Sequence, residues 1–406
     1  MAIELIFEAF SKKHTYRLND AVTNINTGTL NQITNTFMYI AKIGAYIVVF
    51  EYLAIAHLPR TWATFVLAYI LKDFFYYWAH RMSHEINLFW GGHVVHHQSE
   101  DFNLSVALRQ SSTSIIWSFP FYLPMAIIGI DPMQFALVSG LNLIYQFWIH
   151  TEHIDKMGPL EYIFNTPSHH RVHHGRDPKY LDKNYAGTFI IWDRMFGTFQ
   201  AEEERPNYGI TTPLNSWNPI YANFAHYIDL YGWLKQVRNI PDAFRLLFKG
   251  PGWFPEYMGG AKIPAEVSKD YVKYNAHRTL NIQLYIMLQF FASLIITALY
   301  LFNYKAVKEM GDLGMIIKLS YSAWIVVSTL NIGVMFESKY WAIWVMEIIR
   351  LVAVPLCAAF YIMEGLSFPY WVVWIGAGYA GLSILHFLLV WQNRGTKLHS
   401  TIQEVG

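Results

Sequence analysis

The chain has 406 residues, of which 54% are hydrophobic, 17% aromatic and only 15% charged. Soluble domains carry about a quarter charged residues, so this composition excludes an ordinary soluble protein, a disordered chain and a fibrous one. Thirty Lys and Arg residues against 29 Asp and Glu leave a formal net charge of +1, which offers no field for a polyanion and predicts no nucleic-acid partner.

The N-terminal residues MAIELIFEAFSKKH lack a basic start followed by an apolar core, so no cleaved signal peptide is expected. Beyond a polar stretch that ends near residue 37, apolar segments recur along the chain. Each is close to the roughly 20 residues that a membrane-spanning helix needs. They cover 38–58, 62–80, 112–130, 132–150, 280–303, 314–336, 341–363 and 370–392. The sequence therefore predicts an all-α, multi-pass transmembrane protein with about eight spans.

The third and fourth segments allow a second interpretation. Pro120 and Pro124 interrupt the third segment, and Asp131-Pro132 leaves room only for a tight turn before the fourth. These two segments could therefore form a re-entrant hairpin instead of two full spans.

Three regions follow from this pattern. Residues 1–37 form an N-terminal cytosolic segment, and 38–279 combine four spans with a polar stretch, 151–279, which we expect to form a cytosolic helical cap. Residues 280–406 form a C-terminal four-span module with almost no histidine. Most Lys and Arg residues then lie on the cytosolic side, as the positive-inside rule requires. The expected location is the endoplasmic reticulum of a eukaryote or the inner membrane of a bacterium.

Seventeen histidines accompany a single cysteine, Cys357, which excludes an intramolecular disulfide, a four-thiolate iron–sulfur cluster and a cysteine-rich zinc site. Eleven of these histidines form four clusters at or beside the predicted cytosolic ends of the spans. Residues i and i+4 share one helix face, so several of them can hold a metal together. Uncoordinated imidazoles crowded in this way would repel one another when protonated. The candidate ligands of this dimetal site are His80, His84, His93, His96, His97, His150, His153, His169, His170, His173 and His174.

An all-nitrogen ligand set suits iron, zinc or copper, and the lack of thiolates argues against a blue-copper or haem-thiolate site. We favour iron because a redox metal explains a site that can meet a lipid chain, with zinc as a possible substitute. A histidine-rich membrane metal transporter is the alternative from another class. Its ligands would be expected near the middle of the spans rather than at their ends.

The motifs DFFYYWAH, HRMSHE, GGHVVHH and NTPSHHRVHHG occur in this order. Together they resemble the fatty acid hydroxylase and sterol desaturase superfamily of membrane di-iron enzymes. Within it, WGGHVVHHQSEDFNLSVALRQS, FWIHTE and EYIFNTPSHHRVHHG resemble the alkylglycerol monooxygenases. The resemblance extends from about residue 16 to residue 199.

The resemblance implies two iron ions that use O2 to hydroxylate the carbon next to the ether oxygen of an alkylglycerol lipid. The product would break down to a fatty aldehyde and a glycerol lipid. The resemblance also implies tetrahydrobiopterin as the electron donor. The chain has no dinucleotide-binding motif and no haem-carrier domain, so electrons must come from a diffusible cofactor or from an electron-donor protein. The alternative substrates are a sterol, a sphingoid base, a fatty acyl chain or an ornithine lipid.

Carried over residue by residue, the ligands of the superfamily fall on all the clustered histidines except His153 and His169. Superfamily members often have a further histidine four residues after the one that matches His150, but position 154 is isoleucine. Either His153 serves from a shifted helix turn, or one metal has a position that is vacant or filled by a carboxylate such as Glu152.

Acidic residues near the clusters are candidates for supporting or catalytic roles, because ligating histidines usually donate their second N–H to an acid or a carbonyl. Asp73 lies inside a predicted span, and we expect it to meet a ligand imidazole rather than only Lys72. Glu100 and Asp101 could orient ligands or bind the cationic edge of a cofactor, or could simply start a solvated helix. Glu85 matches the glutamate that the family links to pterin use.

Asn184, in the sequence KNYAGT, resembles a position that the family places near the metals. An Asx turn explains this asparagine equally well.

Overall fold

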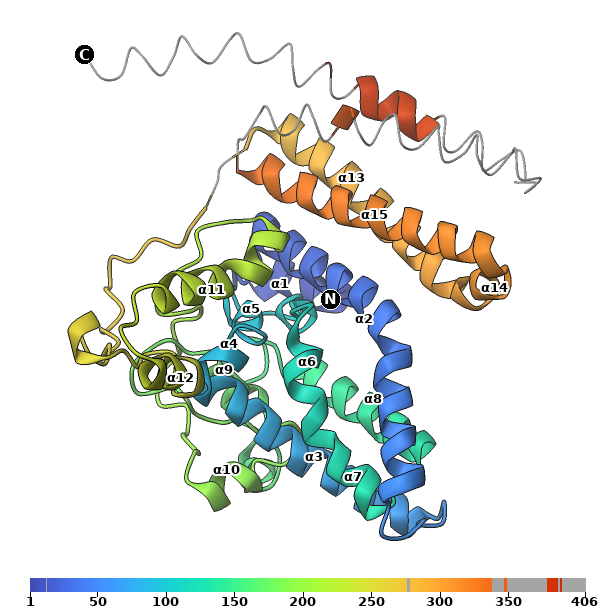
Figure 1. Cartoon of the computed structure of the whole chain (residues 1–406). Coiled ribbons are helices and arrows are strands. Elements are labelled where there is room, and N and C mark those ends of the chain that lie inside the picture. Colours follow the sequence, from blue (N-terminus) through green and yellow to red (C-terminus); the bar gives the residue numbers. More distant parts are fainter. Residues whose placement is uncertain (12, 276–277, 338–346, 349–377, 386–387, 389–406) are drawn as a thin grey trace. The chain divides into compact units, whose positions relative to one another are not determined.

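The structure is a computed structural model that describes residues 1–11, 13–275, 278–337, 347–348, 378–385 and 388. The chain divides into two compact units, one of residues 1–215 and 219–274 and one of residues 216–218 and 275–406. The regular elements of the described residues are all helical, apart from two isolated β-bridges (Figure 1). This confirms the all-α prediction.

Helix α2 (Leu18–Leu53) is the longest helix of the first unit and changes character along its length. Its N-terminal half buries polar side chains, and the amides of Asn24 and Asn31 donate to Ser105 Oγ at 3.0 Å and to the Ser111 carbonyl at 2.6 Å. A Cβ on Gly28 would lie 2.2 Å from the Leu108 carbonyl oxygen, so glycine permits this close approach. The C-terminal half is apolar and largely exposed, as in a membrane span. The predicted boundary at residue 37 therefore falls inside one continuous helix.

Helix α3 (Trp62–Glu85) follows and carries the first histidines at its C-terminal end. It starts at a capping box, in which Thr61 Oγ1 accepts from Thr64 N and Thr64 Oγ1 accepts from Thr61 N. Helix α8 (Pro132–Trp148) packs along α3 and starts where Asp131 Oδ1 accepts from Met133 N at 2.9 Å.

Three short helices occupy the predicted third span and directly precede α8. They are α6 (Ser114–Ser118), η2 (Phe119–Tyr122) and α7 (Leu123–Ile128). Pro120 and Pro124 each stand in the first turn of a new helix, where the missing N–H costs nothing. The interruption expected from these two prolines is confirmed.

The apolar core of this part joins α2, α3, α7 and α8. Tyr46 stacks on Phe135 with ring centroids 4.2 Å apart, and its hydroxyl donates to the Ile130 carbonyl at 3.0 Å. The buried residues of the cluster are Tyr46, Phe50, Ala68, Met125, Ala126, Ile130, Phe135 and Val138. This packing fixes α3, whose last turns carry His80 and His84, and α8, which ends two residues before His150.

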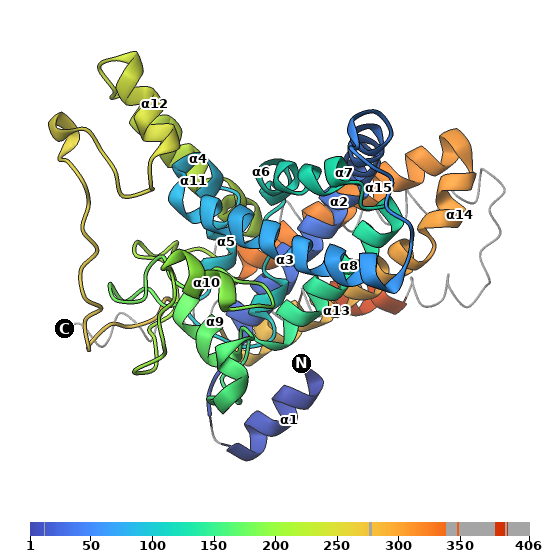
Figure 2. The same cartoon turned by 90° about the horizontal axis from the view of Figure 1, so that it is seen from below.

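Short helices and loops form the rest of the first unit (Figure 2). The short α1 (Ala2–Ser11) precedes α2, and α4 (Asn87–Trp90), α5 (Val94–His97) and η1 (Val106–Leu108) follow α3. After α8 come η3 (Gly158–Tyr162), α9 (Pro167–His173), α10 (Ile191–Phe196), α11 (Pro219–Leu234), α12 (Ile240–Phe248) and η4 (Glu256–Met258).

The second unit contains α13 (Leu280–Phe302), α14 (Tyr304–Glu309) and α15 (Gly311–Phe336), and α13 packs against α15. Of the described helices, α2, α13 and α15 are long and apolar enough to cross a membrane. The predicted spans 62–80 and 132–150 correspond to α3 and α8, which are not among these three. The predicted spans 341–363 and 370–392 lie largely outside the described residues.

Candidate metal centre

Nine imidazoles converge in two groups inside the first unit. We call His80, His84, His93, His97 and His173 the first histidine group, and His96, His150, His170 and His174 the second histidine group. In each group the candidate ligand nitrogens all lie within 4.8 Å of one another. All nine side chains are buried except His93, which is half-buried. These nine are the histidines that the family resemblance indicated.

The helical repeat assigns histidines of one segment to different groups. His80 and His84 lie one turn apart at the end of α3 and join the first group. His93 and His97 are also four residues apart and join the same group, whereas His96 between them points to the second. On and after α9, His170 and His174 form the corresponding i, i+4 pair of the second group. Each of the two HxxHH segments, 93–97 and 170–174, therefore supplies histidines to both groups.

Backbone carbonyls define the tautomer of several rings. The Nδ1 of His80 donates to the Tyr185 carbonyl at 2.7 Å, and that of His173 donates to the Lys183 carbonyl at 2.9 Å. In the second group, the Nδ1 of His96 donates to the Arg109 carbonyl at 3.0 Å. The Nδ1 of His150 likewise donates to the Gln146 carbonyl at 2.8 Å. Because a carbonyl can only accept, the proton sits on Nδ1 and the Nε2 of each neutral ring keeps its lone pair.

These lone pairs face one another. His96 Nε2 lies 3.2 Å from His150 Nε2, and neither nitrogen carries a proton when both rings donate through Nδ1. The Nε2 atoms of His84, His173 and His174 are buried and have no hydrogen-bond partner among the described residues. Such an arrangement is unfavourable unless a cation lies between the nitrogens.

The spacing also fits metal ligation. Nitrogens bound to one ion at about 2.1 Å would be about 3.0 Å apart at right angles and about 4.2 Å apart when opposite. The closest Nε2 pairs are His80 with His93 at 2.9 Å, His93 with His97 at 3.1 Å, and His150 with His170 at 2.9 Å. Both histidine groups therefore fit the ligand set of a metal ion.

Burial keeps several of these rings neutral. It lowers the pKa of His97, His173 and His174 well below the ordinary histidine value, and the neighbouring imidazoles lower it further. Burial also lowers the pKa of His96, to about 4. Since a metal ligand must be unprotonated, the site is ready to bind a cation at neutral pH.

One four-residue segment, 182–185, supports three rings of the first histidine group. It supplies the Lys183 and Tyr185 carbonyls described above, and Asp182 Oδ1 lies 3.6 Å from His84 Nδ1. Asp182 and Asn184 have positive φ angles of 57° and 55°. Asn184 holds the turn, since its amide donates to the His169 and Gln200 carbonyls at 3.0 and 2.7 Å. The asparagine therefore acts on the ligands through the backbone.

We expect Asn184→Ala to weaken iron binding by about 10- to 100-fold, because alanine disfavours the positive φ and removes the side-chain bonds that aim two carbonyls at ligands. Iron titration of the purified protein measures this loss. Asn184→Gly is the matched control, because glycine accepts the backbone angle and lacks only the side chain. Wild-type affinity in the alanine variant would show that the segment does not orient the rings.

His153 and His169 lie outside both histidine groups. The backbone N–H of His153 donates to Thr151 Oγ1 at 3.2 Å. His169 faces away from the groups, with Nε2 3.9 Å from Glu161 Oε2 and its ring edge-on to Phe199. The structure thus brings together only nine of the eleven candidate ligands.

Glu152 is also outside the groups. Its carboxylate accepts from the Tyr208 hydroxyl and lies 3.1 Å from Arg205 Nε. The alternative that this carboxylate fills the missing ligand position is therefore not seen among the described contacts, because two other side chains bind it.

Among the described residues Asp73 contacts no imidazole, in contrast to our expectation. Its Oδ1 accepts from Thr188 N at 2.6 Å and from Asn142 Nδ2 at 2.8 Å, and its Oδ2 accepts from Phe189 N at 2.9 Å and from Trp192 Nε1 at 3.0 Å. The fold brings the loop that contains Thr188 and Phe189 to α3. Its N–H groups donate to the Asp73 carboxylate, which we had expected to bind an imidazole. Asp73 therefore anchors the segment that follows Tyr185.

Gly187 is placed against this anchor, since a Cβ there would lie 2.7 Å from Asp73 Oδ1 and 3.0 Å from a Tyr76 ring carbon. We expect Gly187→Ala to destabilise the protein by about 1–3 kcal/mol through overpacking. Thermal unfolding in detergent tests this against Gly140→Ala, a helical position with nothing within 4 Å of the added Cβ. Equal melting temperatures for the two variants would contradict the tight contact.

The remaining acidic candidates bind cations and N–H groups. Glu85 is partly exposed, and its Oε1 accepts from Arg81 Nε at 2.8 Å. Glu100 accepts from the Tyr271 hydroxyl and from Tyr274 N at 2.8 Å. Asp101 accepts from Arg17 Nε at 2.7 Å and from Lys273 Nζ at 2.8 Å. Glu100 and Asp101 are buried, so the alternative of a solvated helix start is wrong for both.

Several residues around the centre carried no recognisable signal in the sequence. Phe102 packs against His150 and His174, with ring centroids 5.7 and 5.2 Å away, and Tyr208 stacks on it at 5.0 Å. Arg109 is fully buried and donates to Val95 O, Asn24 Oδ1 and Gln98 Oε1. These bonds hold the residue in place, and its backbone carbonyl accepts from His96 Nδ1. Burial lowers the pKa of this guanidinium to about 10.

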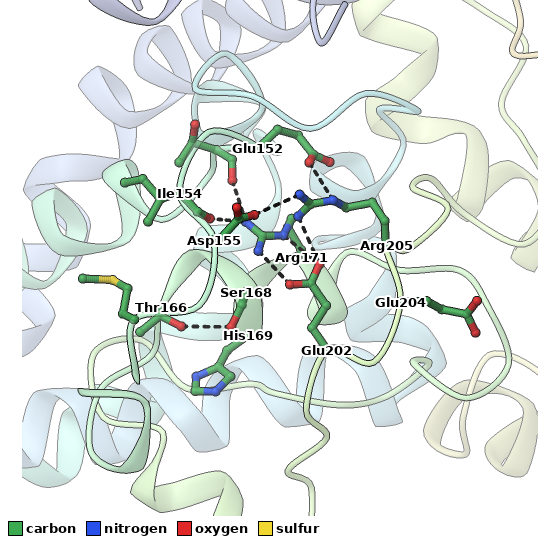
Figure 3. A network of polar contacts seen from close by, with 12 residues as sticks. Glu152, Ile154, Asp155, Thr166, Ser168, His169, Arg171, Glu202, Glu204 and Arg205 are labelled. Atoms are coloured by element: carbon green, nitrogen blue, oxygen red, sulfur yellow. Dashed lines mark hydrogen bonds and ion pairs between the residues drawn. The ribbon is translucent and has the colours of Figure 1, made fainter. Parts of the chain in front are cut away.

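Helix α9, which carries histidines of both groups, is fixed by Arg171 (Figure 3). This side chain is fully buried and makes a two-point ion pair with Glu202 at 2.8 and 2.7 Å. Its third nitrogen donates to the carbonyls of Thr151 and Ile154 at 3.0 and 2.7 Å. Thus one buried cation ties α9 to the loop that follows His150.

Comparisons with known proteins agree with this site. The family model for fatty acid hydroxylase matches residues 65–198, which include all nine grouped histidines. Alkylglycerol monooxygenase of Homo sapiens is 43% identical over 295 residues, covering 71% of this chain and 66% of that protein. The Xenopus tropicalis and Danio rerio alkylglycerol monooxygenases are each 37% identical, covering 84% and 87% of this chain and 75% and 79% of their own.

No solved structure matches the chain. The coverage and identity of the relatives show the family, and the fatty acid hydroxylase match shows the kind of catalytic domain. The chain therefore belongs to the alkylglycerol monooxygenase family, and it is a membrane oxidoreductase, a lipid monooxygenase.

Proposed function

We propose that this chain is a di-iron enzyme that cleaves the ether bond of alkylglycerol lipids by O2-dependent hydroxylation of the carbon next to the ether oxygen. The observation that carries the proposal is the pair of histidine groups with buried, inward-facing ring nitrogens, in a member of the alkylglycerol monooxygenase family. The reaction consumes one O2, two electrons and two protons, gives one water and a hemiacetal, and the hemiacetal breaks down to a fatty aldehyde and a glycerol lipid.

When bound, the two irons would supply the reduction of O2 and the oxidation of the C–H bond. The five histidines of the first group would hold one iron and the four of the second group the other. All-histidine ligation suits iron, although zinc would fit the same nitrogens and would give an inactive protein.

The protein's own contribution is to hold the rings and to exclude water. The carbonyls of Arg109, Gln146, Lys183 and Tyr185 keep the proton on Nδ1, so every Nε2 they control stays available. Phe102 covers the second histidine group. At the first histidine group, the ring centroids of Trp90 and His84 are 4.8 Å apart. A dry site protects the reacting carbon from side reactions.

Tetrahydrobiopterin is the proposed reductant, with Glu85 as the carboxylate that would bind its guanidine-like edge. In support, Glu85 is partly exposed and directly follows His84 of the first histidine group. An electron-donor protein is the alternative reductant.

We further propose that residues 38–279 form the catalytic domain and 280–406 a separate transmembrane module, with the metal centre facing the cytosol. The membrane would be the endoplasmic reticulum in a eukaryote and the inner membrane in a bacterium.

The decisive experiment measures fatty aldehyde release from a 1-O-alkylglycerol by the purified, iron-loaded full-length protein, with and without tetrahydrobiopterin, under air and under argon. We expect aldehyde only when both O2 and pterin are present. Aldehyde with another reductant would retain the reaction and reject the pterin. No aldehyde despite two bound irons would reject the ether substrate in favour of a sterol, sphingoid, fatty acyl or ornithine lipid, which the same preparation can then be offered.

A further inference from the structure

Helix α12 carries a stripe of large apolar side chains on its outer face. Ile240, Phe244 and Phe248 are 74%, 61% and 50% exposed, and their spacing of four residues aligns them along one side of the helix. The inner side is already packed, because Leu246 is buried against Leu230 and Phe254. The outer stripe is therefore not part of this core.

Exposed basic residues lie on α12 and on the segments that flank it in the chain. Lys235, Arg238, Arg245 and Lys249 are all exposed. The one acidic residue of the helix, Asp242, is buried and accepts from Asn239, Tyr257 and Arg245. The outer surface of α12 therefore combines exposed apolar side chains with positive charge and carries no carboxylate of its own.

Aromatic rings lie beneath two of these cations. The Arg238 guanidinium lies 4.6 Å from the Tyr257 ring, and Lys249 Nζ lies 5.0 Å from the Trp253 ring. Tyr and Trp beside Lys and Arg are typical of segments at the headgroup level of a membrane. Figure 2 shows α12 at the edge of the first unit, next to α11 and α4.

We propose that α12 lies in the plane of the membrane surface, with Ile240, Phe244 and Phe248 inserted at the boundary of the acyl chains and the four cations bound to anionic lipid phosphates. An amphipathic helix of this charge and shape binds lipid through its buried apolar area and its attraction to anionic headgroups. Two observations favour a lipid surface as the partner of this helix. Its cations complement anionic headgroups, and the same chain has apolar helices long enough to cross a bilayer.

The position of α12 links this anchor to the metal centre. The carbonyls of Leu246 and Lys249 accept from Asn87 Nδ2 at 2.9 Å and from Asn87 N at 2.8 Å. Asn87 lies two residues after the end of α3, whose last turns carry His80 and His84. A lipid-bound α12 thus sets the height of the first histidine group above the bilayer. This inference is independent of which lipid the enzyme oxidises.

The test uses the full-length protein with Cys357→Ser and one new cysteine, Phe244→Cys, labelled with a fluorophore and reconstituted into vesicles. Nitroxide-bearing lipids should remove most of the fluorescence, and more strongly with phosphatidylserine present than in pure phosphatidylcholine. A label at Ile240→Cys should behave alike, while one at the exposed Glu203→Cys should keep its fluorescence. Retained iron content checks that each labelled protein is folded.

Replacing the four cations by glutamine in the Phe244→Cys protein should abolish the dependence on phosphatidylserine. Quenching of the α12 labels by aqueous iodide but not by lipid nitroxides would overturn the proposal. Protection from both quenchers would also overturn it, because another part of the protein or a second copy would then cover the stripe.

Discussion

Replacing His96 by alanine is expected to remove the iron of the second histidine group and to lower aldehyde release by at least about 100-fold. The second group has only four imidazoles, and its His96 Nε2 faces His150 Nε2 at 3.2 Å. Loss of one ligand leaves three, whereas the first group keeps four after a single substitution. Iron content per protein and O2-dependent aldehyde formation measure the two effects separately.

His153 provides the matched control for this experiment. It is close to His150 in sequence but lies outside both groups, so His153→Ala should retain two irons and near wild-type activity. His84→Ala should be less damaging for iron content than His96→Ala, since four imidazoles remain. An active His96→Ala enzyme with two bound irons would refute the assignment of the second histidine group.

Arg171→Ala is expected to be the most destabilising single change near the site, at about 3–5 kcal/mol, because it leaves the buried Glu202 carboxylate without its two-point partner. The carbonyls of Thr151 and Ile154 lose their donor as well. Since α9 then loses its tie to the loop after His150, iron content should fall together with the melting temperature.

Arg205→Ala is the comparison, because Arg205 approaches the same Glu202 at 3.2 Å but is 41% exposed (Figure 3). Solvent screens this pair and the pairs that Arg205 makes with Glu152 and Asp155, so the loss of each should cost about 0–1 kcal/mol. A double variant, Arg171→Met with Glu202→Leu, should recover much of the stability, because no buried charge is left unpaired. Equal melting temperatures for Arg171→Ala and Arg205→Ala would contradict the anchoring role of the buried ion pair.

The sequence by itself was enough to predict the membrane class and to single out the nine histidines that the structure brings together. A low charged fraction and repeated apolar segments require a bilayer, and i, i+4 histidines must share a helix face whatever the rest of the fold does. The interruption at Pro120 and Pro124 followed equally from local chemistry, because proline cannot continue a helix. Each of these conclusions depends on neighbours in sequence.

Only the tertiary structure decided how the nine histidines divide between two groups and what supports them. The acceptors of the Nδ1 protons are backbone carbonyls, for example those of Arg109 and Tyr185, and every residue type offers the same carbonyl. The partners of Asp73 were missed for a related reason, since the loop that solvates it lies more than 100 residues away in the chain. Side-chain type and helical spacing are written in the sequence, whereas contacts between distant segments arise only when the chain packs.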